Sequence, residues 1–206
     1  MKNIGKYVVL VVVLMVFESC VGEVKEKLSK ATEGVSNVST FVKEARKVEG
    51  RIEKLKDATP LTNEQLKDWL PPNLGDLERT GFKVGQAGMY QVNSVEGTFK
   101  MLDSKKKLTI MIIDGAGPTG SMMASGYGLL GNFEMETEDE YQHQQTVEVN
   151  DIRAQQTYKK KSNDTQLIFA FAERFLVTVN ANDMLPDETW DMVDNLELEQ
   201  LTDMAE

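Results

Sequence analysis

The chain has 206 residues, a formal net charge of −10, one Cys and one His. A disulfide framework and a Cys/His zinc site each need several such side chains within one chain, so the composition excludes both, and we expect no metal or cofactor. Nucleic-acid binding depends on Lys and Arg side chains that face phosphates, so an acidic chain argues against that class as well.

The first twenty residues have the pattern of a targeting segment. Lys2 and Lys6 precede an unbroken apolar run at residues 8–17, and the small Ser19 stands directly before Cys20. This run is too short to cross about 30 Å of hydrocarbon, which takes about 20 residues. The order of basic, apolar and small residues therefore predicts a secretory signal peptide at residues 1–19.

The residues around the single Cys resemble the end of a bacterial lipoprotein signal, in which cleavage leaves an acylated Cys as the new N-terminus. The stretch is Phe17-Glu18-Ser19-Cys20, in which Ser19 fits and Phe17 and Glu18 depart from the usual residues. The resemblance implies that Cys20 carries acyl chains such as palmitate, which hold the protein on a membrane. Ordinary secretion and an uncleaved anchor are the alternatives.

A seven-residue apolar repeat follows and predicts a long N-terminal helix. Its positions are Val24, Leu28, Ala31, Val35, Val38, Val42, Ala45, Val48, Ile52 and Leu55. This spacing forms one apolar stripe on a helix while the many Lys and Arg side chains stay in water. We expect residues 20–58 to form a lipid-anchored stalk, either a spacer or a self-associating coiled coil; a helix packed along its own domain is the alternative.

Residues 59–206 are predicted to form an acidic α+β head domain that begins after Pro60. Thr62 and Gln65 have the spacing of a capping box at the start of a short helix at about 63–69. Strands are expected at 95–101, where apolar residues alternate, and at 108–113, where both faces are apolar and the strand should be central. An earlier strand is expected near residues 89–92.

The second half of the head is predicted to contain a helix at about 118–130, strands at 141–149, 152–158, 167–171 and 175–179, and a final helix that begins at Pro186. This order favours an α+β fold with a mainly antiparallel sheet of about six strands and two or three helices, preceded by the long N-terminal helix.

Gly115, Gly117 and Gly120 follow a strand and open a helix, and Glu134 comes nineteen residues after Gly115. On spacing alone this matches a dinucleotide-binding fingerprint. Hairpins rather than βαβ units surround the motif, and Pro118 removes an amide at the helix start. We therefore expect the glycines to form a tight turn that lets the helix pack closely on the sheet, with a bound small anion as the alternative.

Two other polar features are weaker candidates. The acidic run contains Glu134, Glu136, Glu138, Asp139 and Glu140. Its spacing does not match a calcium loop, so a solvated loop or sheet edge is expected. His143 lies on an alternating strand with no nucleophile placed by a motif, so we expect a structural or surface role for it.

Large, adaptable side chains are the candidate ligand contacts: Met122, Met123, Tyr127 and Trp190, with Met184 and Met192 near them in the sequence. They could line an apolar pocket between the helix at 118–130, the last helix and the sheet. Core packing explains the same residues equally well.

Residues from about 69 to 201 resemble a family of bacterial cell-envelope proteins of unknown function. The segments that carry the resemblance are Leu70-Pro71, residues 73–80, 87–90 and 110–115, Glu140-Tyr141, and residues 173–179 and 195–201. The resemblance implies a membrane-linked envelope protein and provides no active residues to transfer.

These features predict a non-enzymatic lipoprotein of the bacterial cell envelope. Its head would lie in the periplasm or at the cell surface and bind a partner protein or an envelope component, with no nucleic acid involved. A carrier or sensor of a small apolar ligand is the second hypothesis. A hydrolase or dinucleotide enzyme is the third.

Overall fold

The computed structural model describes residues 48–87, 92–130 and 134–206. The chain divides into two units at residue 48, and the second, residues 48–206, is compact. The predicted signal peptide, Cys20 and the part of the stalk before residue 48 lie outside the described residues. In the described part, no helix is both long and apolar enough to cross a membrane.

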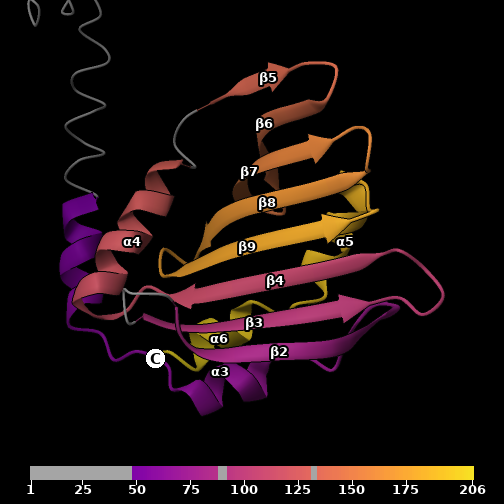
Figure 1. The fold of residues 1–206 in the computed structure, drawn as a ribbon. Coiled ribbons are helices and arrows are strands. Elements are labelled where there is room, and N and C mark those ends of the chain that lie inside the picture. Colours follow the sequence, from indigo (N-terminus) through magenta and orange to yellow (C-terminus); the bar gives the residue numbers. More distant parts are fainter. Residues whose placement is uncertain (1–47, 88–91, 131–133) are drawn as a thin grey trace, which may run out of the picture. The chain divides into compact units, whose positions relative to one another are not determined.

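The second unit is built on one nine-stranded sheet, antiparallel throughout, with the order β1-β2-β3-β4-β9-β8-β7-β6-β5 (Figure 1). The strands are β1 (Asn73–Leu74), β2 (Leu77–Ala87), β3 (Val92–Lys100), β4 (Lys107–Asp114), β5 (Glu136–Glu138), β6 (Gln142–Val149), β7 (Ile152–Lys159), β8 (Asp164–Phe171) and β9 (Phe175–Asn182). Two meanders, β1 to β4 and β5 to β9, join where β4 pairs with β9. The expectation that the strand at 108–113 is central is confirmed.

Five helices accompany this sheet in the described residues. They are a helix at residues 48–56, α3 (Asn63–Trp69), α4 (Gly117–Leu130), α5 (Pro186–Asp194) and α6 (Glu199–Asp203). Thr62 caps α3: its side chain accepts from the Gln65 backbone amide, and the Gln65 side chain accepts from the Thr62 amide. This confirms the predicted capping box, which satisfies two amides that have no partner within the helix.

The prediction of about six strands and two or three helices is wrong, and the missed strands have a common physical cause. β2 carries charged residues and two glycines, and β5 consists of three exposed residues, so neither has the apolar alternation that marks a strand in sequence. β1 is only two residues long. These strands form because a neighbouring strand offers free backbone groups for pairing, which is information that lies elsewhere in the chain.

The sheet separates two hydrophobic clusters. Successive side chains of a strand point to opposite faces. Ile112 and Val177 therefore join the large cluster, while their neighbours Ile113 and Leu176 join a smaller one. Figure 1 shows α5 and α6 behind the sheet and α4 in front of one end of it.

The helix at residues 48–56 belongs to the same compact unit as the sheet. Leu55 is buried in the smaller cluster together with Ala124 of α4 and Leu176 of β9. This end of the predicted stalk therefore packs against the folded part of the chain.

Candidate functional site

The residues predicted to line an apolar pocket lie on opposite faces of the sheet. Met123 and Tyr127 of α4 pack against the smaller cluster, and Met122 is 62% exposed. Trp190 of α5 belongs to the large cluster, where it stacks on Phe169 with ring centroids 5.9 Å apart. The structure therefore places no common pocket between these four side chains, and Trp190 acts as a core residue.

The three glycines of the motif make a tight turn between β4 and α4. A Cβ on Gly115 would lie 2.3 Å from the Arg174 carbonyl oxygen, and one on Gly120 would lie 2.7 Å from the Gly115 carbonyl carbon. Gly117 has φ of +83°, a conformation that favours glycine. The expectation of a tight turn with close helix packing is confirmed, and the all-antiparallel sheet lacks the βαβ unit of a dinucleotide fold.

Asp114 and Arg174 form a buried ion pair at the same turn. The Arg174 Nε and Nη2 atoms donate to the two Asp114 carboxylate oxygens at 2.8 and 2.9 Å, and the Asp114 side chain is fully buried. Asp114 also accepts from the backbone amides of Leu61 and Ala116. Arg174 in turn donates to the carbonyl oxygens of Thr59 and Ala205. The pair therefore ties together four distant segments and has a structural role.

The ion pair between Asp114 and Arg174 was not predicted from the sequence. The signal that could have found it is a carboxylate directly after the apolar residues 110–113 of a central strand, because a buried charge in such a position needs a partner. The sequence did not identify Arg174 as that partner, because it lies 60 residues away from Asp114.

The acidic run lies around β5 and the turn that follows it, and its carboxylates have partners within the chain. The Lys160 ammonium group donates to Glu138 at 2.7 Å and lowers the pKa of that carboxyl group. Backbone amides of Gln142 and Tyr141 donate to Asp139 and lower its pKa. His143 contacts Glu136 at 3.2 Å. In the described ranges, no three His, Cys, Asp or Glu side chains are grouped to hold a metal ion.

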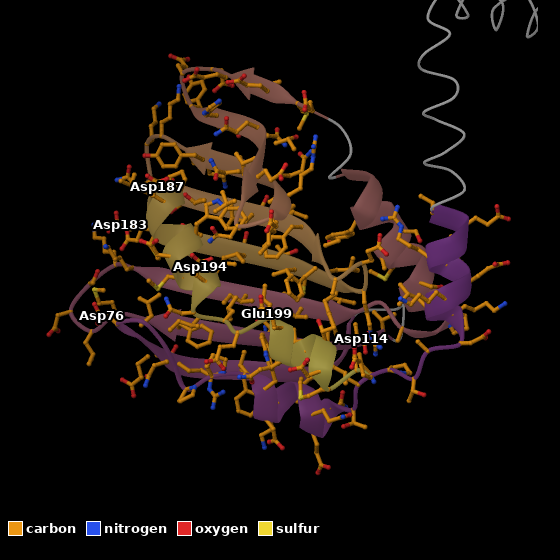
Figure 2. All side chains as sticks on the ribbon, turned by 180° about the vertical axis from the view of Figure 1, so that it is seen from behind. Asp76, Asp114, Asp183, Asp187, Asp194 and Glu199 are labelled. Atoms are coloured by element: carbon orange, nitrogen blue, oxygen red, sulfur yellow. The ribbon has the colours of Figure 1, made fainter. Side chains whose placement is uncertain are left out.

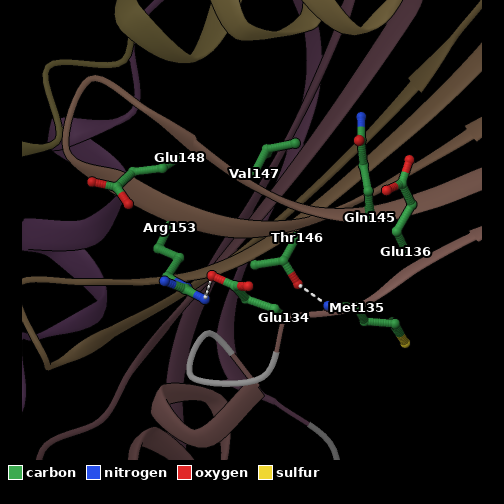
Figure 3. A pocket seen from close by; sticks show the side chains of 8 residues that line it. All are labelled: Glu134, Met135, Glu136, Gln145, Thr146, Val147, Glu148 and Arg153. Atoms are coloured by element: carbon green, nitrogen blue, oxygen red, sulfur yellow. Dashed lines mark hydrogen bonds and ion pairs between the residues drawn. The ribbon is translucent and has the colours of Figure 1, made fainter.

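A pocket of about 340 Å³ lies between the edge of β6 and the start of β5 (Figure 3). Its lining residues are Glu134, Met135, Glu136, Gln145, Thr146, Val147, Glu148 and Arg153. Arg153 Nη2 is 3.7 Å from Glu134 Oε1, and the side chain of Glu134 is 90% exposed. The pocket is an open surface feature, because the side chains of its three carboxylates are exposed.

A row of uncharged polar side chains crosses the sheet on the face opposite the large cluster. The row occupies successive partner positions on seven strands: Thr98, Thr109, Asn180, Gln166, Thr157, Gln144 and Thr137. We call these residues the polar row. At a strand spacing of about 4.8 Å it extends over roughly 29 Å. Figure 1 shows α4 over one end of this face, while α5 and α6 lie on the other side of the sheet.

Charged residues of both signs, among them Glu96, Lys100 and Lys107, flank the polar row on its own face, whereas the C-terminal part of the chain is uniformly acidic. Every charged residue from Pro186 to the end of the sequence is acidic, and Asp187, Asp194 and Glu199 lie on α5 and α6, which face the viewer in Figure 2. The row itself carries no charge, and Gln166 Nε2 donates to Asn180 Oδ1 at 2.8 Å within it. Strand alternation positions the row, because its neighbours Leu108 and Ile110 point into the core. The sequence predicted several of these strands but not the register that aligns their polar residues.

No family model matches the chain, and no curated protein matches it. A comparison with solved structures finds a likeness to the crystal structure of a GTP binding regulator from Thermotoga maritima. The two chains are 9% identical, the match covers 66% of this chain and 88% of that chain, and the TM-score is 0.32. At this TM-score the likeness carries no argument, and the resemblance to an envelope-protein family stays a prediction.

Proposed function

We propose that this protein is a non-enzymatic lipoprotein of the bacterial cell envelope. An acylated Cys20 anchors it to a membrane, and its head, in the periplasm or at the cell surface, binds an uncharged, hydroxyl-rich polymer of the envelope along the polar row. The observation that carries the binding proposal is the unbroken alignment of Thr, Asn and Gln side chains across seven strands.

The chemistry of the polar row favours a glycan strand over a protein partner. Thr hydroxyl groups and Asn and Gln amides both donate and accept hydrogen bonds, which matches the hydroxyl groups of a sugar polymer. The centre of a protein–protein interface is usually apolar and rich in aromatic, Met and Arg side chains. The row has instead Asn180, Gln166 and Thr157 at its centre, on the three adjoining strands β9, β8 and β7.

The anchoring part of the proposal rests on the sequence around Cys20. The basic, apolar and small residues before it have the order of a cleaved signal, and the single Cys stands where a lipid would be attached. Two acyl chains provide stable membrane attachment, since each buried methylene contributes about 0.8 kcal/mol.

The glycan proposal is tested with dextran as a neutral polymer probe. We expect the purified protein to migrate more slowly in native gels that contain dextran, relative to a reference protein. The variants Thr109→Val and Asn180→Leu keep side-chain shape and remove hydrogen bonds, so together they should weaken retardation roughly tenfold. Gln200→Leu on α6 is the control and should migrate like the wild type, because Gln200 is exposed on another element.

Equal retardation of the row variants and the wild type would contradict binding along this row. A protein partner would give a different pair of results. Neither dextran nor a neutral galactomannan would retard the protein, and a cross-linker at position 109 would capture a protein in cells.

The anchor is tested by membrane partition of the full chain expressed in a bacterium. We expect the wild type in the detergent-soluble membrane fraction, with a mature N-terminus at a diacylated Cys20. Cys20→Ala should lose the lipid and leave that fraction or accumulate as the unprocessed precursor. Ser19→Ala is the matched control, because it keeps a small residue before the Cys and should be processed normally. A soluble mature protein that starts at another residue would exclude the anchor.

A further inference from the structure

A second pocket, of about 260 Å³, lies among the helix at residues 48–56, the turn between β8 and β9, and the C-terminal residues. Apolar groups of Leu55, Ala58, Phe175 and Ala205 form part of its wall, and Arg51 lines it with a cationic side chain. All of these residues belong to the same compact unit.

Arg51 has hydrogen-bonding capacity that the described residues do not use. Its side chain is 15% exposed, and its Nε and Nη2 atoms are buried without a hydrogen-bond partner. Its Nη1 atom lies 3.7 Å from Glu173 Oε1, whose side chain is 70% exposed. Buried donors without a partner destabilise a protein, and the penalty is larger for a charged group. The position therefore favours a ligand that accepts hydrogen bonds and carries negative charge.

Arg174, which lines the same pocket, shows that a carboxylate fits the Nε and Nη2 donors of a guanidinium group. Arg174 uses its own Nε and Nη2 atoms to hold both oxygens of the Asp114 carboxylate, at 2.8 and 2.9 Å. These two donors point in parallel and match a carboxylate in the bidentate geometry that Arg favours. On Arg51 the same pair of donors is unoccupied.

We propose that this pocket binds a small monocarboxylate with a short apolar body. The carboxylate pairs with Arg51 Nε and Nη2 after a small side-chain adjustment, and the apolar body packs against Leu55 and Phe175. Lys54 adds a second cation to the lining, while Glu173 and Glu206 add carboxylates. Asp114 already neutralises Arg174, and the two remaining cations are matched by two carboxylates, so the lining has no surplus positive charge. A monoanion held by paired hydrogen bonds therefore fits better than a dianion such as phosphate.

The proposal is tested by titrating the full chain, purified in detergent, with hexanoate in a calorimeter. We expect saturable binding of one hexanoate, and no binding of hexanamide, which has the same shape without the charge. Arg51→Met should weaken hexanoate binding at least tenfold, and Arg51→Lys should weaken it less, because Lys keeps the charge but lacks the paired donors. Lys56→Met, an exposed position on the same helix, should bind like the wild type.

A thermal unfolding measurement separates binding from a structural role of Arg51. Without ligand, Arg51→Met should unfold at the same or a higher temperature than the wild type, because it removes unsatisfied donors. A lower unfolding temperature without ligand would overturn the proposal, as would equal binding of hexanamide or full hexanoate affinity in Arg51→Met. Tighter binding of inorganic phosphate than of hexanoate would overturn the ligand class. None of these outcomes depends on the polar row or on Cys20.

Discussion

Asp114→Ala is expected to lower the free energy of unfolding by about 3–5 kcal/mol, because it leaves the buried Arg174 guanidinium group without its counter-charge. The change also removes the acceptors of the Leu61 and Ala116 amides. Urea unfolding followed by tryptophan fluorescence measures the effect, since Trp69 and Trp190 are both buried. The loss is large for a domain of ordinary stability, so reduced amounts of folded protein are expected as well.

Two comparisons make this result specific to the ion pair. Glu96→Ala breaks a pair in which the Lys83 side chain is 81% exposed, and should change stability by less than about 1 kcal/mol. Arg174→Ala should destabilise the wild type strongly and the Asp114→Ala variant much less, because the two side chains stabilise each other. Additive losses from the two substitutions would contradict the coupled role derived for them.

Gly115→Ala is expected to destabilise the protein by about 3 kcal/mol or more, at the upper end of the range for overpacking. The new Cβ would lie 2.3 Å from the Arg174 carbonyl oxygen and 2.7 Å from the Ala124 Cβ. The carbonyl oxygen cannot move away easily, because it accepts the Gly115 amide and belongs to the residue paired with Asp114. Thermal or urea unfolding without any ligand measures the loss.

Gly126→Ala is the matched control for this substitution. Gly126 lies within α4, has open space around its Cβ position, and does not have a positive φ. Alanine at this helical position should therefore stabilise the protein by about 0.5–1 kcal/mol. If Gly115→Ala kept wild-type stability, the tight packing assigned to this turn would be incorrect.

Elements marked by short-range chemistry were predictable from sequence. The capping box at Thr62, the proline at the start of α5 and the central position of β4 all depend on residues within one turn or one strand. The same reasoning recognised that the three glycines form a turn. Predictions from local patterns succeed here because the side chains and backbone groups that form each feature are neighbours in the chain.

The candidate sites were predicted much less well from the sequence than the individual elements. The helical residues grouped as one pocket, Met122, Met123, Tyr127 and Trp190, have similar chemistry but are separated by the sheet. Conversely, Arg51 and Phe175 lie far apart in the chain and line one pocket. Similar residue types predict a shared environment only when their elements pack on the same side, and that depends on strand order.

The amino-acid sequence by itself determined the exclusion of disulfides, the pattern of a targeting segment that ends at Cys20, and the type of many individual elements. Only the tertiary structure decided that the described residues form nine strands, that Asp114 meets Arg174 and that seven polar side chains align in one row. Caps and periodicity arise between residues a few positions apart, whereas strand register and buried charge pairs arise when distant segments come together and satisfy each other's hydrogen bonds and charges.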